Sequence, residues 1–501
     1  MALFRPLLPL LGVVCGALCA QMPLTGSSSE PTAFDGFQPV GLLKNAVDVD
    51  AFTTFGHPLF PGYSARIKRL EKWCDEQVGA YTGYIDVQAR HLFFYFFESK
   101  NNSATDPVVL WTNGGPGSSS SLGLFQELGP CRITNDTDGP VPFKESWNAN
   151  ANIFFIDNPI GVGFSYAEYG ESVSTTEEAS IDIARFMVLF FENFPQFKGR
   201  SLHLSGESYG GRYLPMFGAA IYDQNAELVE AGLDPLNLVS VMIGNGMTDP
   251  HLMLPAWAEY ACTKTTAATP FLDISTCVRM KKADNCEDPH DTMNCEHAFT
   301  FCAMEIMLPV NALEINPYNV AKPSCPYFPE CYSESFAIAA YLSRPDVREM
   351  LGVDAAVPAP YQGHSEKVQY AFLFEGADMQ PKTTAYVGAL LERGVRVLIY
   401  VGKDGMSRHF YGNTRFSREL DWICNEIGNW AWLSVLDWTG GEAFNQAETR
   451  DWKVDGNVAG ETRSSGLLTW VTIDGAGHLV PYDQPKAALA MVDRWLGGLP
   501  M

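Results

Sequence analysis

The candidate nucleophile of this chain is Ser208, which lies in the segment S-G-E-S-Y-G-G at residues 205–211. The segment contains the pattern G-x-S-x-G, in which a strand turns sharply into a helix and presents a serine hydroxyl at the end of a sheet. Glycines are expected on both sides of the serine because the strained turn leaves no room for side chains. In a chain with 44 glycines the pattern is weak evidence by itself. The interpretation therefore depends on the partners that the chain supplies for Ser208.

A hydrolytic serine needs a base that takes its proton, an acid that orients the base, and donors for the oxyanion of the transition state. Where this serine turn belongs to a hydrolase sheet, the acid and then the histidine follow it on loops after late strands. His478 is the candidate base, because it follows an apolar run at 468–473 and a G-A-G loop. A single histidine after a strand is more often structural, so His478 gains weight only together with the serine and an acid.

Short apolar runs predict buried strands that alternate with helices. The runs are 108–111, 153–156, 202–204, 238–243, 395–401 and 468–473. A helix is predicted at 176–194, where Thr175 and Glu178 form a capping box, and a closing helix at 485–496. Residues 81–87 and 91–97 predict a hairpin of antiparallel edge strands. The alternation predicts an α/β fold with a mostly parallel central sheet and helices on both faces.

The order of these patterns predicts how the chain is divided. Residues 1–20 have the pattern of a signal peptide, and 21–69, rich in Pro, Gly, Ser and Thr, are interpreted as a propeptide or an N-terminal arm. Lys68 and Arg69 form either a dibasic processing site or two solvated charges at the start of a helix, and the second interpretation is preferred. The α/β core is predicted at 70–246 and again at 384–501. Between them, residues 247–383 lose the alternation and gain cysteines and prolines, which predicts an inserted, disulfide-stapled cap.

Composition limits the classes of binding partner and the cellular compartment that we expect for this protein. The net charge of −24 argues against nucleic acid and anionic membranes as partners. No run after the signal peptide is apolar enough to predict a membrane span. The chain has 12 cysteines, of which Cys15 and Cys19 lie in the signal peptide, and sequons begin at Asn101 and Asn135. We therefore expect a glycosylated, disulfide-bonded protein of the secretory pathway, either secreted or held in a vacuolar or lysosome-like compartment; its oligomeric state is left open.

Four segments of the chain resemble the signature blocks of the serine carboxypeptidase family. They are W-T-N-G-G-P-G-S-S-S at 111–120, G-E-S-Y-G-G at 206–211, D-W-I-C-N at 421–425 and G-H-L-V-P-Y-D-Q-P at 477–485. The likeness runs from about residue 81 to 496, in the order of the family. It implies an α/β-hydrolase fold with a disulfide-rich inserted cap. It also implies a serine-type carboxypeptidase that acts on peptides or proteins with a free C-terminus and needs neither metal nor cofactor.

The resemblance also implies the roles of individual residues. Ser208 would be the nucleophile that forms an acyl-enzyme, His478 the general base, and Asp421 the acid that orients the histidine. The backbone N–H groups of Gly115 and Tyr209 would form the oxyanion hole. Two other enzymatic roles on this scaffold, an acyltransferase and an esterase, remain open as alternatives. A catalytically impaired binding protein is a further alternative if the insertion before Asp421, described below, is a real part of the protein.

Four further residues would hold the C-terminal carboxylate of the substrate. By the resemblance they are Trp111, Asn113, Glu127 and Glu207. Two glutamates and a substrate carboxylate cannot all be ionised in one pocket, so a proton must be shared. We therefore expect peptides to bind best at acidic pH, and peptide amides and esters to lose less affinity as pH rises.

The chain departs from the family's pattern before Asp421. In the family an apolar strand such as 397–402 is followed after two residues by the catalytic acid, whereas here about sixteen more residues intervene, at about 404–420. The excess shows no helix or strand pattern. It is either a true loop near the active site or a retained intron. Asp404 lies closer to the strand end and competes for the role, but Asp421 is preferred because W-I-C-N follows it directly.

Cysteines form a second departure. Ser118 stands where many family members carry a disulfide cysteine, so a bridge from this position is absent. Pairings are proposed between Cys74 and Cys131, Cys262 and Cys277, Cys286 and Cys295, and Cys325 and Cys331. Cys424 matches a position that is often a free thiol near the active site. The sequence does not settle the connectivity.

Overall fold

The computed structural model of the protein describes most of the chain from residue 37 onward. The described residues are 37–49, 51–135, 139–263, 270, 272–283, 316–323, 331–376, 378–411, 414–418 and 420–501. The predicted signal peptide lies outside them, as do Cys286, Cys295 and Cys325, so the pairings predicted for these cysteines are not described.

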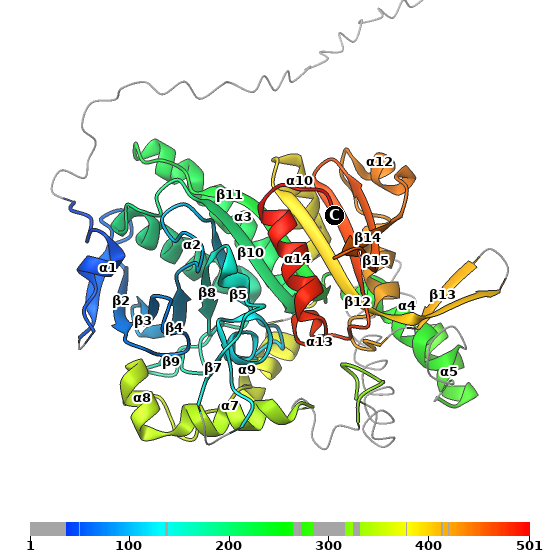
Figure 1. The fold of residues 1–501 in the computed structure, drawn as a ribbon, viewed down its shortest axis with the longest axis horizontal. Helices are drawn as coiled ribbons and strands as arrows, with labels where there is room; N and C mark the ends of the chain where they lie inside the picture. The colour runs from blue at the N-terminus through cyan, green and yellow to red at the C-terminus, as the bar shows by residue number, and fades with distance from the viewer. Residues whose placement is uncertain are drawn as a thin grey trace, which may run out of the picture.

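Among the described residues, one mixed sheet of 14 strands runs through the molecule (Figure 1). Its order is β1-β2-β3-β4-β8-β5-β10-β11-β12-β16-β15-β14, with β9 beside β4 and β13 beside β12. The bounds are β1 (Thr53–Gly56), β2 (Tyr63–Leu70), β3 (Ala80–Val87), β4 (Arg90–Phe97), β5 (Val108–Thr112), β8 (Asn152–Ile156), β9 (Tyr166–Ala167), β10 (Ser201–Ser208), β11 (Asn237–Gly246), β12 (Arg396–Tyr411), β13 (Thr414–Arg418), β14 (Arg450–Val454), β15 (Asn457–Ser465) and β16 (Leu468–Asp474). Neighbours from β8 to β16 are parallel, and the outer strands are antiparallel. The predicted, mostly parallel sheet is confirmed.

Helices cover both faces of the sheet and enclose two apolar cores. Along β5, Val108 and Leu110 pack into one core, while Val109 and Trp111 pack into the other, because alternate side chains of a strand point to opposite faces. The first core is completed by α2 (Thr176–Asn193), α3 (Gly210–Glu230) and α10 (Thr383–Glu392). The second is completed by the π-helix η1 (Gly123–Leu128), α7 (Ser333–Ser343), α8 (Pro345–Leu351) and α14 (Pro485–Leu496). In Figure 1, α14 crosses in front of the sheet and α7 and α8 lie below it.

The N-terminal part of the sheet differs from the prediction. Strands β1 and β2 extend the sheet beyond β3, so the stretch 21–69 is not only a propeptide or loose arm. Lys68 and Arg69 lie in β2, not at the start of a helix, and that prediction was wrong. The hairpin of β3 and β4 is confirmed, but it is not an edge, because β2 and β8 flank it. Strands β14 and β15 form the far edge and were not predicted.

The elements described within the segment predicted as a cap, 247–383, are helices joined by turns and loops. It contains α4 (Pro250–Cys262), α5 (Ile274–Ala283), α7, α8, α9 (Glu366–Tyr370) and the π-helix η3 (Ala371–Glu375), and α10 begins at its end. A disulfide joins Cys262 at the end of α4 to Cys277 in α5. The disulfide and the helices give this segment internal support, and no strand of the main sheet falls within its described part.

The unexpected segment before Asp421 is a β-hairpin. Strand β12 pairs with β16 up to Lys403, then continues beyond the sheet and pairs antiparallel with β13. Asp404 is paired with Arg418 at the base of this hairpin, so the chain leaves and returns at neighbouring positions. The hairpin projects from the body beside α4 and α5 (Figure 1). The sequence shows no clear helix or strand pattern here, so this hairpin was not predicted.

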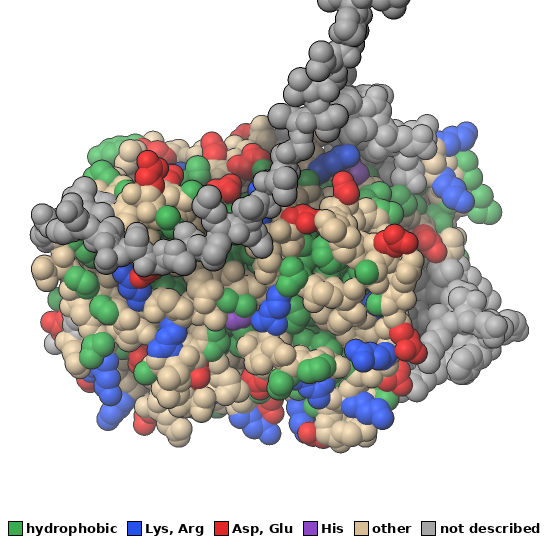
Figure 2. Space-filling model, turned by 90° about the horizontal axis from the view of Figure 1, so that it is seen from above, with side chains coloured by type: hydrophobic (Ala, Val, Ile, Leu, Met, Phe, Trp, Pro, Cys, Tyr) green, Lys and Arg blue, Asp and Glu red, His purple; other side chains and the backbone are tan. Residues whose placement is uncertain are grey.

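Figure 2 shows one face of the molecule. On this face the acidic and basic side chains of the described residues are interspersed. Within the described residues, every helix is too short or too polar to cross a bilayer.

Candidate active site

Ser208 ends β10, which lies in the middle of the parallel sheet between β5 and β11. Its backbone φ is +59°, a left-handed conformation that is strained for a serine and typical of a nucleophile held at a tight turn. A Cβ on Gly206 would collide with the carbonyl oxygen of Thr112 on β5, so glycine is required there. A Cβ on Gly210 would meet nothing closer than 3.5 Å. Glycine on both sides of the serine is therefore not explained by crowding alone.

His478 lies in the loop that follows β16. Asp421 lies in the loop that follows the hairpin, and the two side chains contact each other. The His478 Nδ1 atom lies 2.8 Å from Asp421 Oδ2. Both side chains are buried, with 2% and 0% of their surfaces exposed. The His478 backbone N–H donates to the carbonyl of Tyr318 at 2.8 Å, which fixes the loop that carries the ring. The structure thus brings together the histidine and the acid that the sequence selected.

Asp421 receives hydrogen bonds on both oxygens. The backbone N–H groups of Ile423 and Cys424 donate to Oδ1 at 3.0 and 3.1 Å. The side chain of Asn245 donates to Oδ2 at 2.7 Å. Asn245 is fixed in turn by the N–H of Gly402, which donates to Asn245 Oδ1 at 3.1 Å. Asn245 was not singled out as a site residue, and only its place in the G-N-G run at the end of β11 marked it in the sequence.

The competing acid, Asp404, lies in the hairpin of β12 and β13. Its side chain lies outside the described residues, and its backbone is paired with Arg418. The chain returns to the body just before Asp421, where the N–H of Val320 bonds to the carbonyl of Leu420 at 3.0 Å. The hairpin thus separates β12 from Asp421 in sequence, while Asp421 remains in contact with the histidine.

Asn113 joins two buried glutamates beside the serine. Its Nδ2 atom donates to Glu127 Oε1 at 3.1 Å and to Glu207 Oε1 at 3.0 Å. Its Oδ1 atom accepts from Trp111 Nε1 and from the N–H of Gly123, both at 2.9 Å. These two bonds determine the orientation of the amide, so that its donors must face the carboxyl groups. Trp111, Asn113, Glu127 and Glu207 therefore form one connected cluster, as the resemblance implied.

The two carboxyl groups of this cluster need a proton. Burial raises the pKa of Glu127, and burial together with the nearby Glu127 carboxyl raises the pKa of Glu207 well above its usual range. Glu127 is 1% exposed and Glu207 is 3% exposed. Neither Oε2 atom receives a hydrogen bond from a donor among the described residues. A shared proton between the carboxyls satisfies both of them, since two adjacent buried carboxylates would repel each other.

The glycine-rich loop after β5 lies directly against the serine turn. A Cβ on Gly114 would collide with the backbone N of Tyr209, and Gly115 has a φ of +110°, which favours glycine. The loop is anchored behind by the Ser120 hydroxyl, which donates to the carbonyl of Ile156 at 2.6 Å. It is also held by Ser119, whose hydroxyl donates to Asp157 at 2.5 Å. The backbone of Gly114, the residue before Gly115, therefore meets that of Tyr209 beside Ser208.

A cavity of about 180 Å³ connects these groups. Ser208, His478, Asn113, Glu127 and Glu207 all line it. The stretch 247–383 supplies much of the remaining wall, namely Met247, Trp257, Tyr318, Tyr332, Ser335, Ile338, Tyr361, Gly363, His364, Gln369, Leu373 and Met379. The sheet loops therefore supply the reactive groups, and the stretch 247–383 supplies much of the surface around them.

Comparison with known proteins identifies the family. A sequence profile described as serine carboxypeptidase matches residues 73–498. Carboxypeptidase Y homolog A of Pyrenophora tritici-repentis is 38% identical over 451 residues, which covers 87% of this chain and 77% of the relative. Carboxypeptidase Y of Candida albicans is 37% identical over 449 residues, with the same coverage of 87% and 77%. The chain belongs to the serine carboxypeptidase family.

The fold agrees with this family. The crystal structure of Kex1(delta)p, a prohormone-processing carboxypeptidase from Saccharomyces cerevisiae, matches with a TM-score of 0.68 and 22% identity, covering 89% of this chain and 95% of that one. The predicted α/β-hydrolase fold is confirmed. As a member of the family, the chain is a serine-type carboxypeptidase whose substrates are peptides. The alternative of a binding protein without activity is not supported.

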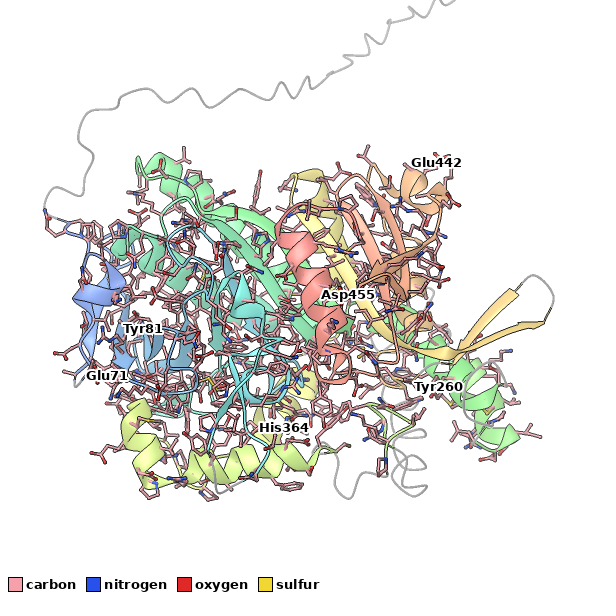
Figure 3. All side chains as sticks on the ribbon, in the orientation of Figure 1. Glu71, Tyr81, Tyr260, His364, Glu442 and Asp455 are labelled. Atoms are coloured by element: carbon pink, nitrogen blue, oxygen red, sulfur yellow. A yellow bond between two sulfur atoms is a disulfide. The ribbon has the colours of Figure 1, made fainter. Side chains whose placement is uncertain are left out.

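Ser118 stands where other serine carboxypeptidases were expected to carry a disulfide cysteine. In this chain Ser118 makes a polar contact instead. The Ser118 hydroxyl lies 3.2 Å from His364 Nδ1, and the two residues also form an isolated β-bridge. Burial lowers the pKa of His364. In Figure 3, His364 lies between the end of the sheet and the helix α7. The contact holds the glycine-rich loop to the stretch 247–383 at Ser118, which cannot form a disulfide.

The cysteines of this serine carboxypeptidase that are described fit the secretory pathway. Disulfides join Cys74 to Cys131 and Cys262 to Cys277, both of which are pairings that the sequence suggested. Cys331 is disulfide-bonded, and Cys424 is a buried free cysteine. Disulfides persist in oxidising compartments, so the protein belongs to the secretory pathway. The two sequon asparagines, Asn101 and Asn135, are exposed on the surface of the protein.

Proposed function

We propose that the enzyme removes single residues from the C-termini of peptides through an acyl-enzyme on Ser208. His478 takes the proton of the Ser208 hydroxyl as its oxygen attacks the scissile carbonyl. The oxyanion is stabilised by the N–H groups of Gly115 and Tyr209. When the tetrahedral intermediate collapses, His478 gives the proton to the departing amine. Water then attacks the ester, with His478 again as the base, and the serine is restored.

In this proposal Asp421 orients the histidine and balances its charge. The 2.8 Å contact from Nδ1 leaves the other ring nitrogen, Nε2, for the serine. Asn245 acts as a positioning residue, because it holds the Asp421 oxygen that contacts the histidine. The alternative acid, Asp404, has no role in this proposal.

The observation that carries the proposal is the position of the Asn113 cluster next to the nucleophile. Glu207 is adjacent to Ser208 in the chain, and it is bonded to Asn113 at 3.0 Å. A substrate carboxylate that binds Asn113 and the protonated pair would lie about one residue from the serine oxygen. Only the last peptide bond of a chain places its carbonyl at this distance from a free carboxylate. The cluster therefore explains removal of one residue at a time.

The raised pKa of Glu207 supports an acidic working range. At acidic pH the pair holds its proton and can donate it to the substrate carboxylate. As pH rises through the raised pKa, the second glutamate ionises and repels that carboxylate, so KM increases. Substrates whose C-terminus is an amide carry no charge there and lose less. We propose on this basis that the enzyme works in an acidic, vacuolar or lysosome-like compartment rather than in neutral surroundings.

One experiment tests the mechanism and the cleavage pattern together. A peptide of ten residues and its C-terminal amide are digested at several pH values, and the products are followed by mass spectrometry. We expect loss of one C-terminal residue at a time from the free acid, fastest at acidic pH, and a weaker pH dependence for the amide. An organophosphonate should label Ser208 and stop the reaction, whereas Ser208→Ala should take no label. Internal cleavage, or activity in Ser208→Ala, would refute the proposal.

A further inference from the structure

One buried carboxyl close to the nucleophile has no role in the proposed mechanism. Asp378 lies between η3 and α10 and is 1% exposed. The backbone N–H of Thr176 donates to its Oδ1 atom at 2.6 Å, and the Thr176 hydroxyl donates to its Oδ2 atom at 2.7 Å. The hydroxyl of Tyr209 also donates to Oδ2, at 2.7 Å. Asp378 therefore joins the first turn of α2 to the residue that follows Ser208.

Arg212 supplies the positive charge beside this carboxyl. It lies in the first turn of α3 and is fully buried. Its Nε atom lies 3.7 Å from Asp378 Oδ2. Its Nη2 atom donates to the backbone carbonyls of Asp378 and Pro381, the latter at 3.0 Å. A buried ion pair is costly to break from one side, because the remaining charge is left without a partner. Asp378 is thus fixed to the start of α3 through its side chain and through its backbone.

Tyr209 is held at both ends. Its backbone carbonyl accepts the N–H groups of Arg212 and Tyr213 at 2.9 and 3.2 Å, which begins α3. Its ring packs edge-on against the ring of Tyr213, with 5.2 Å between centroids. Burial and the charge of Asp378 raise the pKa of Tyr209 well above the usual range, so the hydroxyl keeps its proton and remains a donor. With its backbone and its hydroxyl both fixed, the residue has little freedom to move.

The backbone N–H of Tyr209 is the group for which this fixation matters. It is one of the two donors proposed for the oxyanion. Its nitrogen lies so close to the glycine-rich loop that a Cβ on Gly114 would collide with it. An oxyanion hole works because its donors are already in place when the charge forms, and such groups must be held within about 0.5 Å of the productive geometry. Fixing Tyr209 therefore stabilises the transition state more than the bound substrate.

We propose that Asp378 is a positioning residue for the oxyanion hole. It holds the Tyr209 hydroxyl and thereby keeps the Tyr209 N–H directed at the place where the oxyanion forms. This proposal rests on the proposed function, since that function assigns the N–H of Tyr209 to the oxyanion. Asp378 acts on the reaction only through Tyr209, with Arg212 as its counter-charge and Thr176 as its anchor on α2.

A second group of tyrosine, aspartate and arginine provides a matched comparison away from the cavity. The Tyr63 hydroxyl donates to Asp182 Oδ1 at 3.1 Å, and Arg90 Nη2 donates to the same oxygen at 3.0 Å. Asp182 lies in α2 and is 2% exposed. The residues that line the cavity include Tyr209 but none of these three. Loss of the bond between Tyr63 and Asp182 should therefore affect stability alone.

The first test removes only the hydroxyl of Tyr209. Tyr209→Phe is compared with the wild type for kcat and KM on a blocked dipeptide at one acidic pH. We expect kcat to fall by about tenfold, which is less than the loss of about 10²- to 10³-fold for a missing oxyanion donor, because the N–H remains but is less well placed. KM should stay within about twofold. Tyr63→Phe is the matched control and should keep wild-type kcat and KM, whatever it does to thermal unfolding.

Two inhibitors separate the transition state from the ground state. With a peptide aldehyde, the Ser208 oxygen bonds to the aldehyde carbon, the serine proton passes to His478, and the former carbonyl oxygen takes the negative charge in the oxyanion hole. The blocked amino acid released from the dipeptide binds without this adduct. Tyr209→Phe should raise Ki for the aldehyde by about tenfold and leave Ki for the product within about twofold. A role in stability alone would lower Tm and leave the ratio of the two Ki values unchanged.

Asp378→Asn tests the other side of the contact. It keeps the size of the side chain but removes its charge, so we expect kcat to fall by about tenfold or more and Tm to fall as Arg212 loses its counter-charge. In the double variant with Tyr209→Phe, the loss of kcat should be smaller than the product of the two single losses, because both substitutions remove one contact. Asp182→Asn is the control and should keep wild-type kcat.

Wild-type kcat and wild-type aldehyde Ki in Tyr209→Phe would overturn the proposal, even if Asp378→Asn did not fold. Equal increases in both Ki values would overturn it as well, and so would a loss of kcat in Tyr63→Phe as large as in Tyr209→Phe. Single losses that simply multiply in the double variant would show that Asp378 does not act through Tyr209. Failure of the proposed function looks different, because Ser208→Ala would then still hydrolyse the dipeptide and the aldehyde would not inhibit the wild type.

Discussion

The buried carboxyl of Asp421, which contacts His478, and those of Glu127 and Glu207, which line the cavity, differ in the source of their hydrogen-bond donors. Asp421 receives donors from Asn245, Ile423, Cys424 and His478, all of them groups of the protein. Glu127 and Glu207 share one donor group, the amide of Asn113, and each has an Oε2 atom that no donor of the described chain reaches. The first carboxyl is complete before substrate arrives, whereas the second pair depends on a proton and a ligand.

This difference separates turnover from binding. The amide groups that donate hydrogen bonds to Asp421 are fixed in position. Removing one of them should therefore reduce kcat and leave KM almost unchanged. Groups that hold the glutamate pair act through a titrating proton, so their loss should change the pH dependence of KM. The following variants test that separation, beginning with the largest expected effect.

Asp421→Asn should lower kcat by about 10³- to 10⁴-fold, because an amide favours the wrong tautomer of His478. KM should change by less than about threefold. The measurement is steady-state kinetics on a blocked dipeptide at several pH values. Asp404→Asn is the control and should retain wild-type kcat. Similar losses in both variants would contradict the assignment of Asp421.

Asn245→Gly should lower kcat by about tenfold, because Asp421 Oδ2 loses the donor at 2.7 Å. Glycine is the right replacement because Asn245 has a φ of +38°. Asn245→Ala should show the same loss of kcat and an additional loss of stability of about 1 kcal/mol from the backbone conformation. If the two variants had wild-type kcat, Asn245 would not be a positioning residue.

Glu207→Gln should flatten the pH dependence of KM for a free C-terminus. A glutamine imitates the protonated acid, so the rise in KM between about pH 5 and pH 7.5 should fall from about tenfold to about threefold. KM for a peptide amide should change little in either enzyme. A rise in KM that stayed as steep as in the wild type would argue against repulsion by Glu207.

The same variant affects stability in a defined direction. The folded state raises the pKa of Glu207, so it binds more protons than the unfolded chain between the unfolded and the folded pKa. The unfolding free energy must then fall as pH rises through that window, beginning near the unfolded value of about 4.3. Glu207→Gln should remove part of this fall, which thermal unfolding at several pH values would detect.

Deletion of residues 404–419, which joins Lys403 to Leu420, should have the smallest effect. The base of the hairpin is closed by the pairing of Asp404 with Arg418, so the ends already lie near each other. We expect kcat/KM within about threefold of wild type and a similar Tm. A loss of kcat/KM of more than tenfold would mean that the hairpin supports Asp421. The hairpin would then count among the groups that hold this carboxyl.

Much of the parallel core could be predicted from sequence because it is locally encoded. Runs such as 108–111 and 153–156 are buried on both faces and therefore continuously apolar. The closing helix was predicted with the bounds that α14 has, since a proline marks its start and its apolar stripe its length. Ser208 and His478 were located by short motifs in which spacing determines geometry.

The features that were missed depend on distant contacts. Strand β2 does alternate, with Ala65 and Ile67 buried, but its Pro- and Gly-rich surroundings suggested an arm. Strands β14 and β15 are largely polar because they lie at an edge of the sheet. Asn245 contacts an acid 176 positions away, and nothing in a G-N-G turn indicates that contact. The hairpin lengthens the segment between β12 and the acid beyond the spacing expected from the family. It does not separate Asp421 from His478.

The division of the cavity wall between two stretches of the chain has a consequence for how such an enzyme can diversify. The groups proposed for bond cleavage lie at the ends of sheet strands, whereas much of the surrounding surface comes from 247–383. Recombination or directed evolution within that stretch can therefore alter which peptides are accepted without rebuilding the reactive centre.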